Sequence, residues 1–99
     1  MATKSNYFWT NQQADGSWLV GLNEEGRRQL GTVYFIDLPA VGTVLEQNRK
    51  FVSVEAANMV TNLESPQAGT IVAINEQLRD QPDDLSSDDP RKNWVVALK

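Results

Sequence analysis

Residues 51–69 read FVSVEAANMVTNLESPQAG, and this stretch decides the fold. In an extended segment Phe51, Ser53 and Glu55 fall on one face and Val52 and Val54 on the other, the two-residue alternation of a strand. A second run of strand-forming residues follows the short break at residues 56–58. We expect a β-hairpin with Asn58 at or near its tip, because Asn tolerates the positive φ of a tight turn. A hairpin alone is only marginally stable, so the rest of the chain must supply a sheet that holds it.

The composition excludes several classes of function. The chain of 99 residues contains no cysteine and no histidine. Disulfides and thiolate chemistry are therefore excluded, and the commonest general base and metal ligand is missing. The formal net charge is −4 and no Lys/Arg cluster stands out, which argues against nucleic acid and anionic membranes as partners.

Length and hydropathy indicate how the chain is organised. Ninety-nine residues suit one domain with a modest core, so we expect a single domain over residues 1–99. No apolar run approaches the length of a membrane span, and the polar residues 2–6 lack a signal-peptide core. The sequence thus predicts a soluble, cytoplasmic domain without a bound metal.

Turn signals at close spacing divide the chain into many short strands. This pattern predicts an all-β fold, a sandwich or flattened barrel of two small antiparallel sheets with one or two short helices. We expect strands or strand-like segments at 7–9, 17–22, 33–36, 43–45, 51–55, 60–63, 70–74 and 94–98. The expected core residues are Val33, Phe35, Val54, Val72 and Val96, and at least two of Ile71, Val72 and Ile74 should be buried.

One segment between the strands has the signals of a helix. Asn23 is placed to cap a helix at residues 24–30, which begins with two acidic residues and is followed by Gly31. Arg27 and Arg28 would complement the dipole at its C-terminal end.

The segment that follows the 70–74 strand is polar. Asn75 is expected to cap a helical turn at residues 76–78, and residues 79–90 are rich in Asp, Ser and Pro, which predicts a loop. The spacing of its acidic residues differs from that of a calcium-binding loop with a central glycine, so we expect a solvated loop. These acidic residues are Asp80, Asp83, Asp84, Asp88 and Asp89.

An ordered set of short motifs carries a resemblance to one family. The chain resembles the H-protein of the glycine cleavage system from about Trp9 to Leu98, and most closely the short forms that stop before that family's C-terminal helix. The resemblance implies a lipoyl/biotinyl-type barrel that presents a modified lysine on a hairpin. The motifs are Val20-Gly21-Leu22, Gly31-Thr32-Val33, Phe35-Ile36-Asp37-Leu38-Pro39, Val41-Gly42, Val54-Glu55, Ser65-Pro66, Gly69, Asn75 and Asp89-Pro90 with Trp94.

The modified lysine of the family is absent. The family pattern Val-Glu-Ser-Val-Lys-Ala here reads Val54-Glu55-Ala56-Ala57-Asn58-Met59. The resemblance therefore places Asn58 at the lipoyl-attachment position. Its neighbours Glu55, Ala56, Ala57 and Met59 are the residues by which the hairpin would be recognised. Lipoate is joined to the lysine ε-nitrogen, whereas the Asn amide is short and non-nucleophilic, and no lysine occurs between residues 51 and 91. We expect no cofactor on this chain.

Two further positions depart from the family pattern. The family has His-Glu before its N-terminal Trp, and that Glu lines the cleft for the loaded arm. Here Tyr7 and Phe8 precede Trp9. The glycine that the family has before the hairpin strand is replaced by Asn48, a residue that also accepts a left-handed conformation.

The resemblance implies a non-catalytic carrier rather than an enzyme. Its family partners would be a pyridoxal-phosphate decarboxylase, a folate-dependent aminomethyltransferase and a dihydrolipoyl dehydrogenase, together with lipoate ligase. With Asn58 in place, we expect the scaffold without the swinging arm. The alternative is an interaction or regulatory module that docks lipoate-handling or related enzymes. Replacement of the lysine by design is a third explanation for Asn58. An enzyme has the least support, because no catalytic set clusters and Glu55 is a lone carboxylate.

Overall fold

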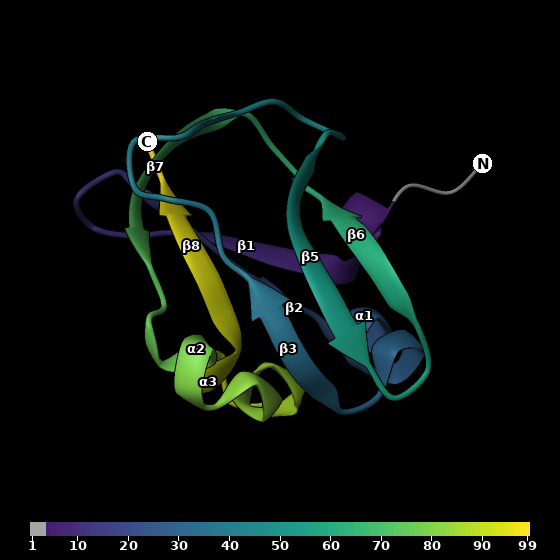
Figure 1. The fold of residues 1–99 in the computed structure, drawn as a ribbon. Coiled ribbons are helices and arrows are strands. Elements are labelled where there is room, and N and C mark those ends of the chain that lie inside the picture. Colours follow the sequence, from purple (N-terminus) through teal and green to yellow (C-terminus); the bar gives the residue numbers. More distant parts are fainter. Residues whose placement is uncertain (1–3) are drawn as a thin grey trace.

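Two antiparallel sheets face each other in the computed structural model, which describes residues 4–99. The larger sheet has the strand order β1-β2-β8-β7-β4 and the smaller one β3-β5-β6 (Figure 1). The predicted mainly β, two-sheet architecture is confirmed. The strands are β1 (Phe8–Gln12), β2 (Trp18–Leu22), β3 (Val33–Asp37), β4 (Val44–Leu45), β5 (Lys50–Ala56), β6 (Val60–Glu64), β7 (Gly69–Ile74) and β8 (Trp94–Leu98).

Short helices join the strands. They are η1 (Lys4–Tyr7), α1 (Glu24–Leu30), α2 (Gln77–Asp80), η2 (Pro82–Ser86) and α3 (Pro90–Asn93). None of the helices within residues 4–99 has the length and apolar character needed to cross a membrane. The polar segment 2–6, for which the sequence predicts no signal-peptide core, falls partly outside the described residues.

Helix α1 has the bounds that the sequence predicts. The Asn23 side chain accepts a hydrogen bond from the backbone N–H of Gly26 (2.8 Å), as an N-cap does. Gly31 ends the helix with a φ of 71°. The two arginines do not contact the carbonyls of the last turn: Arg27 donates to the Leu22 carbonyl oxygen and Arg28 pairs with Glu25.

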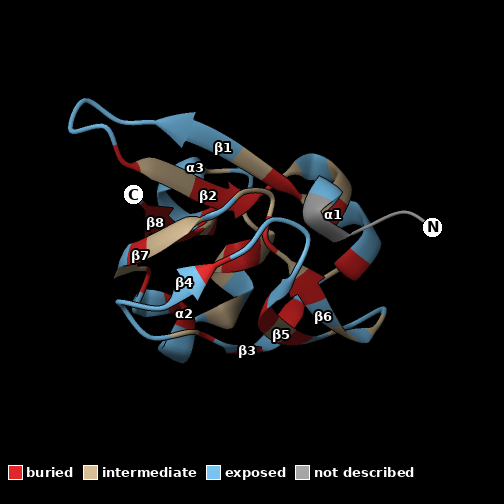
Figure 2. Ribbon diagram, turned by 90° about the horizontal axis from the view of Figure 1, so that it is seen from above, coloured by how far each residue is buried: buried red, intermediate tan, exposed pale blue. Residues whose placement is uncertain are grey.

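The core lies between the two sheets (Figure 2). The larger sheet contributes alternate residues of β2 and much of β8, and the smaller sheet contributes the inward-facing residues of β5 and β6. Three of the five predicted core residues, Val33, Val54 and Val96, are buried. The largest fully buried side chains are Val20, Leu22, Leu30, Val33, Val52, Val54, Leu63, Ile71, Leu78, Leu85, Val95 and Leu98.

The prediction that Phe35 and Val72 are core residues is wrong. Their side chains are 51% and 44% exposed. A register shift between Val33 and Phe35 breaks the alternation in β3, so that Tyr34 and Phe35 are both exposed and Ile36 is buried.

Strand β7 also departs from the predicted burial. Only Ile71 is fully buried, Ile74 is half-buried and Val72 is exposed, so the expectation of two buried residues is wrong. Val72 follows the inward-facing Ile71 and points outward by ordinary alternation. The register shift between Ile71 and Ala73 brings Ile74, not Val72, back to the inner face, where it pairs with the buried Val96.

The predicted loop at residues 79–90 is wrong in part, because it contains η2 and the ends of α2 and α3. Leu78 and Leu85 are fully buried and belong to the core, which fixes this connection to the sheets. The prediction of an Asn75 cap is also wrong. The Asn75 Nδ2 group donates instead to the carbonyl oxygens of Lys92 (3.2 Å) and Trp94 (2.9 Å), and α2 has no side-chain cap.

Candidate functional site: the β5–β6 hairpin tip

The hairpin of β5 and β6 turns through residues 57–59, and Asn58 is exposed there as the sequence predicts. Figure 1 shows this tip beside α1, at the opposite end of the molecule from the C-terminus. The turn closes with a hydrogen bond from the backbone N–H of Ala56 to the Met59 carbonyl oxygen (2.9 Å).

The tip is tied to the end of α1 and to Thr32, two residues beyond it, by three hydrogen bonds. The backbone N–H of Ala57 donates to the Thr32 oxygen (2.8 Å), and that of Asn58 donates to the Leu30 oxygen (3.0 Å). The Asn58 side-chain Nδ2 donates to the Gln29 oxygen (3.1 Å). Carbonyl groups in the last turn of a helix lack intrahelical partners, so the hairpin supplies partners that α1 cannot supply itself.

Gly31 permits this close approach. A Cβ atom at Gly31 would lie 3.1 Å from the Asn58 Nδ2 atom and 3.3 Å from the Ala57 Cβ atom. Its φ of 71° also favours glycine. The link between α1 and β3 therefore depends on a residue without a side chain, and the tip packs directly over it.

The expected positive φ at Asn58 is wrong. Asn48 is the one non-glycine residue with a positive φ (64°) within residues 4–99. The backbone N–H groups of Ala57 and Asn58 donate to the Thr32 and Leu30 oxygens, so contacts outside the hairpin hold this turn without a left-handed residue at its tip. Asn48, by contrast, adopts the left-handed conformation that the sequence predicts for it.

The four neighbours of Asn58 fall into two groups. Glu55 and Ala57 are exposed, whereas Ala56 and Met59 are half-buried and pack against the core. The salt bridges within residues 4–99 join other residues, and none includes Glu55. The tip therefore presents the carboxamide of Asn58 and, three residues earlier in the chain, the carboxylate of Glu55, which is in none of these salt bridges.

The chemistry available at the tip is limited. No amine lies within residues 51–91, and Lys50 is at the far end of β5, paired in register with Glu64. Among the described residues no group of three or more acidic side chains is arranged to hold a metal ion. The tip can donate and accept hydrogen bonds but offers no nucleophile for acylation.

The aromatic residues of β1 lie on opposite faces of the strand. Phe8 is buried and its ring meets Phe51 edge-on, with centroids 5.1 Å apart. The side chain at position 8 thus faces the core. Trp9 points the other way, and a Cβ atom at its cross-strand partner Gly21 would overlap the indole.

Sequence reasoning missed a groove of about 660 Å³ on the outside of the larger sheet. Its walls include the half-buried Trp9, Leu19 and Trp94, with Arg91 at one side. The Trp9 Nε1–H donates to Asn93 Oδ1 (2.9 Å), which joins β1 to the end of α3. The sequence did contain a signal for this groove. Trp9 and Leu19 are large apolar residues next to the inward-facing Phe8 and Val20, so alternation places them on the outer face of the sheet.

Comparisons with known proteins agree with the fold. The sequence profile of the glycine cleavage H-protein matches residues 1–99. Two similar relatives are the glycine cleavage system H protein of Klebsiella pneumoniae (33% identical, covering 92% of this chain and 70% of that protein) and the glycine cleavage system H protein 2 of Pseudomonas aeruginosa (37% identical, with the same coverage). The crystal structure of a glycine cleavage system H protein from Mycobacterium marinum superposes with a TM-score of 0.82 at 25% identity, over 97% of this chain and 80% of that one. The chain belongs to the glycine cleavage H-protein family.

Proposed function

We propose that this chain is an H-protein-like component of glycine cleavage that carries no lipoyl group. The observation behind the proposal is Asn58, which stands at the exposed hairpin tip where the resemblance places the family's lysine. In this proposal residues 1–99 act as a single carrier-type domain that is not itself an enzyme. Its partners are the decarboxylase, the aminomethyltransferase and the dihydrolipoyl dehydrogenase of the system.

The chemistry of the tip supports the absence of the cofactor. Acylation by an activated lipoate requires a nucleophilic amine, and an amide nitrogen has its lone pair delocalised into the carbonyl group. A lysine also supplies a flexible four-carbon stem, on which a carrier depends for reach. The Asn58 side chain is short and donates to the Gln29 oxygen instead.

A second candidate is an interaction module that docks lipoate-handling or related enzymes. The observation that favours it is the fixed position of the tip. Three hydrogen bonds tie residues 57 and 58 to α1 and Thr32, and Glu55 is exposed without an ion-pair partner among the described residues. A fixed tip with a free carboxylate can be recognised by another protein without being modified.

Intact-mass spectrometry after incubation with lipoate ligase, lipoate and ATP tests the proposal. The wild-type chain is expected to keep its mass, because the tip has no amine. Asn58→Lys restores an ε-amine at the exposed position and is expected to gain one lipoyl group. Lys50→Arg in the same variant is the matched control, since it removes the nearest natural lysine and should leave the gain in mass unchanged.

The outcomes separate the two candidates. A lipoyl adduct on the wild-type chain would contradict the proposal and would show that the active position lies elsewhere. If Asn58→Lys folds but stays unmodified, the tip is no longer a ligase substrate, and the interaction module becomes the better account.

A further inference from the structure

The β-bulge in β3 presents two aromatic side chains on the outside of the smaller sheet. Val33 pairs with Ala56 and Phe35 with Glu55, so Tyr34 is the additional residue of the bulge. Tyr34 is 65% exposed and Phe35 51% exposed, whereas Val33 and Ile36 on either side are buried. Bulges commonly redirect side chains in this way beside functional sites.

These aromatic residues continue into a row that crosses the whole smaller sheet. Phe35 lies opposite Glu55 in register, and Glu55 lies opposite Val60. Residues opposite each other in antiparallel strands point to the same face, and all three side chains are exposed, Val60 to 78%. We call Tyr34, Phe35, Glu55 and Val60 the outer patch.

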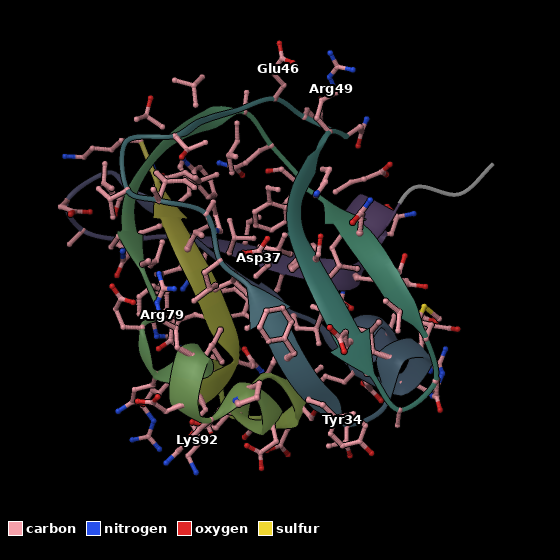
Figure 3. All side chains as sticks on the ribbon, in the orientation of Figure 1. Tyr34, Asp37, Glu46, Arg49, Arg79 and Lys92 are labelled. Atoms are coloured by element: carbon pink, nitrogen blue, oxygen red, sulfur yellow. The ribbon has the colours of Figure 1, made fainter. Side chains whose placement is uncertain are left out.

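The outer patch lies at the same end of the sheet as the hairpin tip. Val33, just before the bulge, pairs with Ala56, the last residue of β5. In Figure 3, Tyr34 is labelled toward the tip end of β3 and Asp37 toward the other end of the strand. A partner that covers the patch would therefore also reach the tip.

The charge on the patch defines what can cover it. Glu55 is flanked by Phe35 and Val60 and takes no part in the ion pairs of residues 4–99. Covering it with a purely apolar surface would desolvate a carboxylate without compensation, which is costly. A cation surrounded by apolar side chains would pair with the Glu55 carboxylate, and the apolar side chains around it would pack against Phe35 and Val60.

A second copy of the chain fits this patch poorly. A two-fold contact centred on the patch would bring the two Glu55 carboxylates together, and the chain carries a formal net charge of −4. Like charges placed opposite each other in this way destabilise an interface.

We propose that the outer patch binds a partner protein that presents an arginine surrounded by apolar side chains. The apolar part would pack on Tyr34, Phe35 and Val60, and the guanidinium would pair with Glu55. The inference goes beyond the proposed function, because it does not depend on the chemical state of position 58.

The experiment uses two synthetic helical peptides as probes of this chemistry. One has leucines along one face with a single arginine within the leucine stripe, and the other has glutamate at the arginine position. The arginine peptide is expected to shift the amide NMR signals of Tyr34, Phe35, Glu55 and Val60 in the wild-type chain and to bind about tenfold more tightly than the glutamate peptide. Added salt should reduce this difference.

Matched variants locate the binding. Val60→Ser should weaken binding of the arginine peptide by about threefold or more, whereas Val44→Ser, the same change at a valine that is 71% exposed on the other sheet, should leave it unchanged. Glu55→Gln should weaken binding of the arginine peptide by about threefold and remove most of the preference over the glutamate peptide.

Three outcomes of the peptide titrations would overturn the inference. They are equal binding of both peptides, signal changes on the larger sheet instead of the outer patch, and no saturable binding up to about 1 mM peptide. Concentration-dependent dimerisation that Val60→Ser abolishes would also overturn it, in favour of a second copy. None of these results bears on the mass-spectrometric test of position 58.

Discussion

Two connections between strands contribute very differently to this protein. The hairpin tip at residues 57–59 lies at the surface and holds its position with three hydrogen bonds to α1 and the segment after it. The connection at residues 75–93 is far richer in polar residues, yet it places Leu78, Leu85 and the side chains of Asn75 and Asn93 in the interior.

The difference shows where this fold tolerates change. Residues of the tip are exposed or half-buried, so the side chain at position 58 can change without loss of the core. The connection joins β7 to β8 and links both to β1 through Asn93 and Trp9, so its side chains are part of the framework. Position 58 is thus open to functional change, and positions 75 and 85 are not.

The largest expected effect is from Leu85→Ala. Leu85 is fully buried, so the truncation should lower the free energy of unfolding by about 2–5 kcal/mol through lost burial and a cavity. Urea denaturation measures the change. The control Val44→Ala, at an exposed position, should change it by less than about 0.5 kcal/mol. A Leu85→Ala variant as stable as this control would show that the connection is an ordinary surface loop.

Asn75→Ala tests the polar half of the same framework. The change removes both hydrogen bonds to the Lys92 and Trp94 carbonyl oxygens and should cost roughly 1–3 kcal/mol, because buried acceptors lose their donor. Thermal and urea unfolding measure it. Asn11→Ala, at an exposed position on β1, is the control and should have little effect. Equal stability of the two variants would argue against a framework role for Asn75.

Asn58→Ala should have a smaller effect. It removes one exposed hydrogen bond, to the Gln29 oxygen, and should cost less than about 1 kcal/mol. Asn23→Ala, which removes the N-cap at the other end of α1, should cost about 0.5–2 kcal/mol in the same urea experiment. If Asn58→Ala costs as much as Asn75→Ala, the tip is part of the framework and the contrast between the two segments fails.

The smallest effect concerns pH and Asp89, the N-cap of α3. Hydrogen bonds from the Arg91 side chain and backbone lower the pKa of Asp89 below its ordinary value of 3.8. The ionised carboxylate therefore stabilises the folded state above the ordinary pKa, and this contribution is lost as the pH falls through the lowered pKa. The difference in melting temperature between wild type and Asp89→Asn should be constant above about pH 5 and shrink below about pH 4. A difference that grows on acidification would contradict this sign.

Much of the fold follows from the sequence because its signals are local. The strands lie where the strand-forming runs are, and Asn23 and Gly31 mark the two ends of α1. The exposure of Phe35 could not be predicted from the sequence. It results from a β-bulge, which reverses the two-residue alternation after Tyr34, and no residue pattern in the sequence indicates where the bulge occurs. Leu85 was missed because its neighbours are acidic and because burial in a connection depends on distant strands.

The site was predictable in position but not in its contacts. The exposed tip at Asn58 follows from the two strand-forming runs around it. Its hydrogen bonds to Gln29, Leu30 and Thr32 join segments far apart in sequence, and no local pattern encodes them. Asn75 illustrates the same limit, since a residue typical of helix caps instead bonds to Lys92 and Trp94.

The place of β8 in the larger sheet has a consequence for how the protein folds. This strand follows all the others in sequence, yet it lies between β2 and β7 and pairs with both. The β1–β2 and β5–β6 hairpins need only local contacts and can form within microseconds. The larger sheet, however, cannot be completed until β8 (residues 94–98) pairs with β2 and β7. On the ribosome, β2 and β7 therefore keep unpaired edges until residues 94–98 have been synthesised, and unpaired edges in this interval favour misassembly.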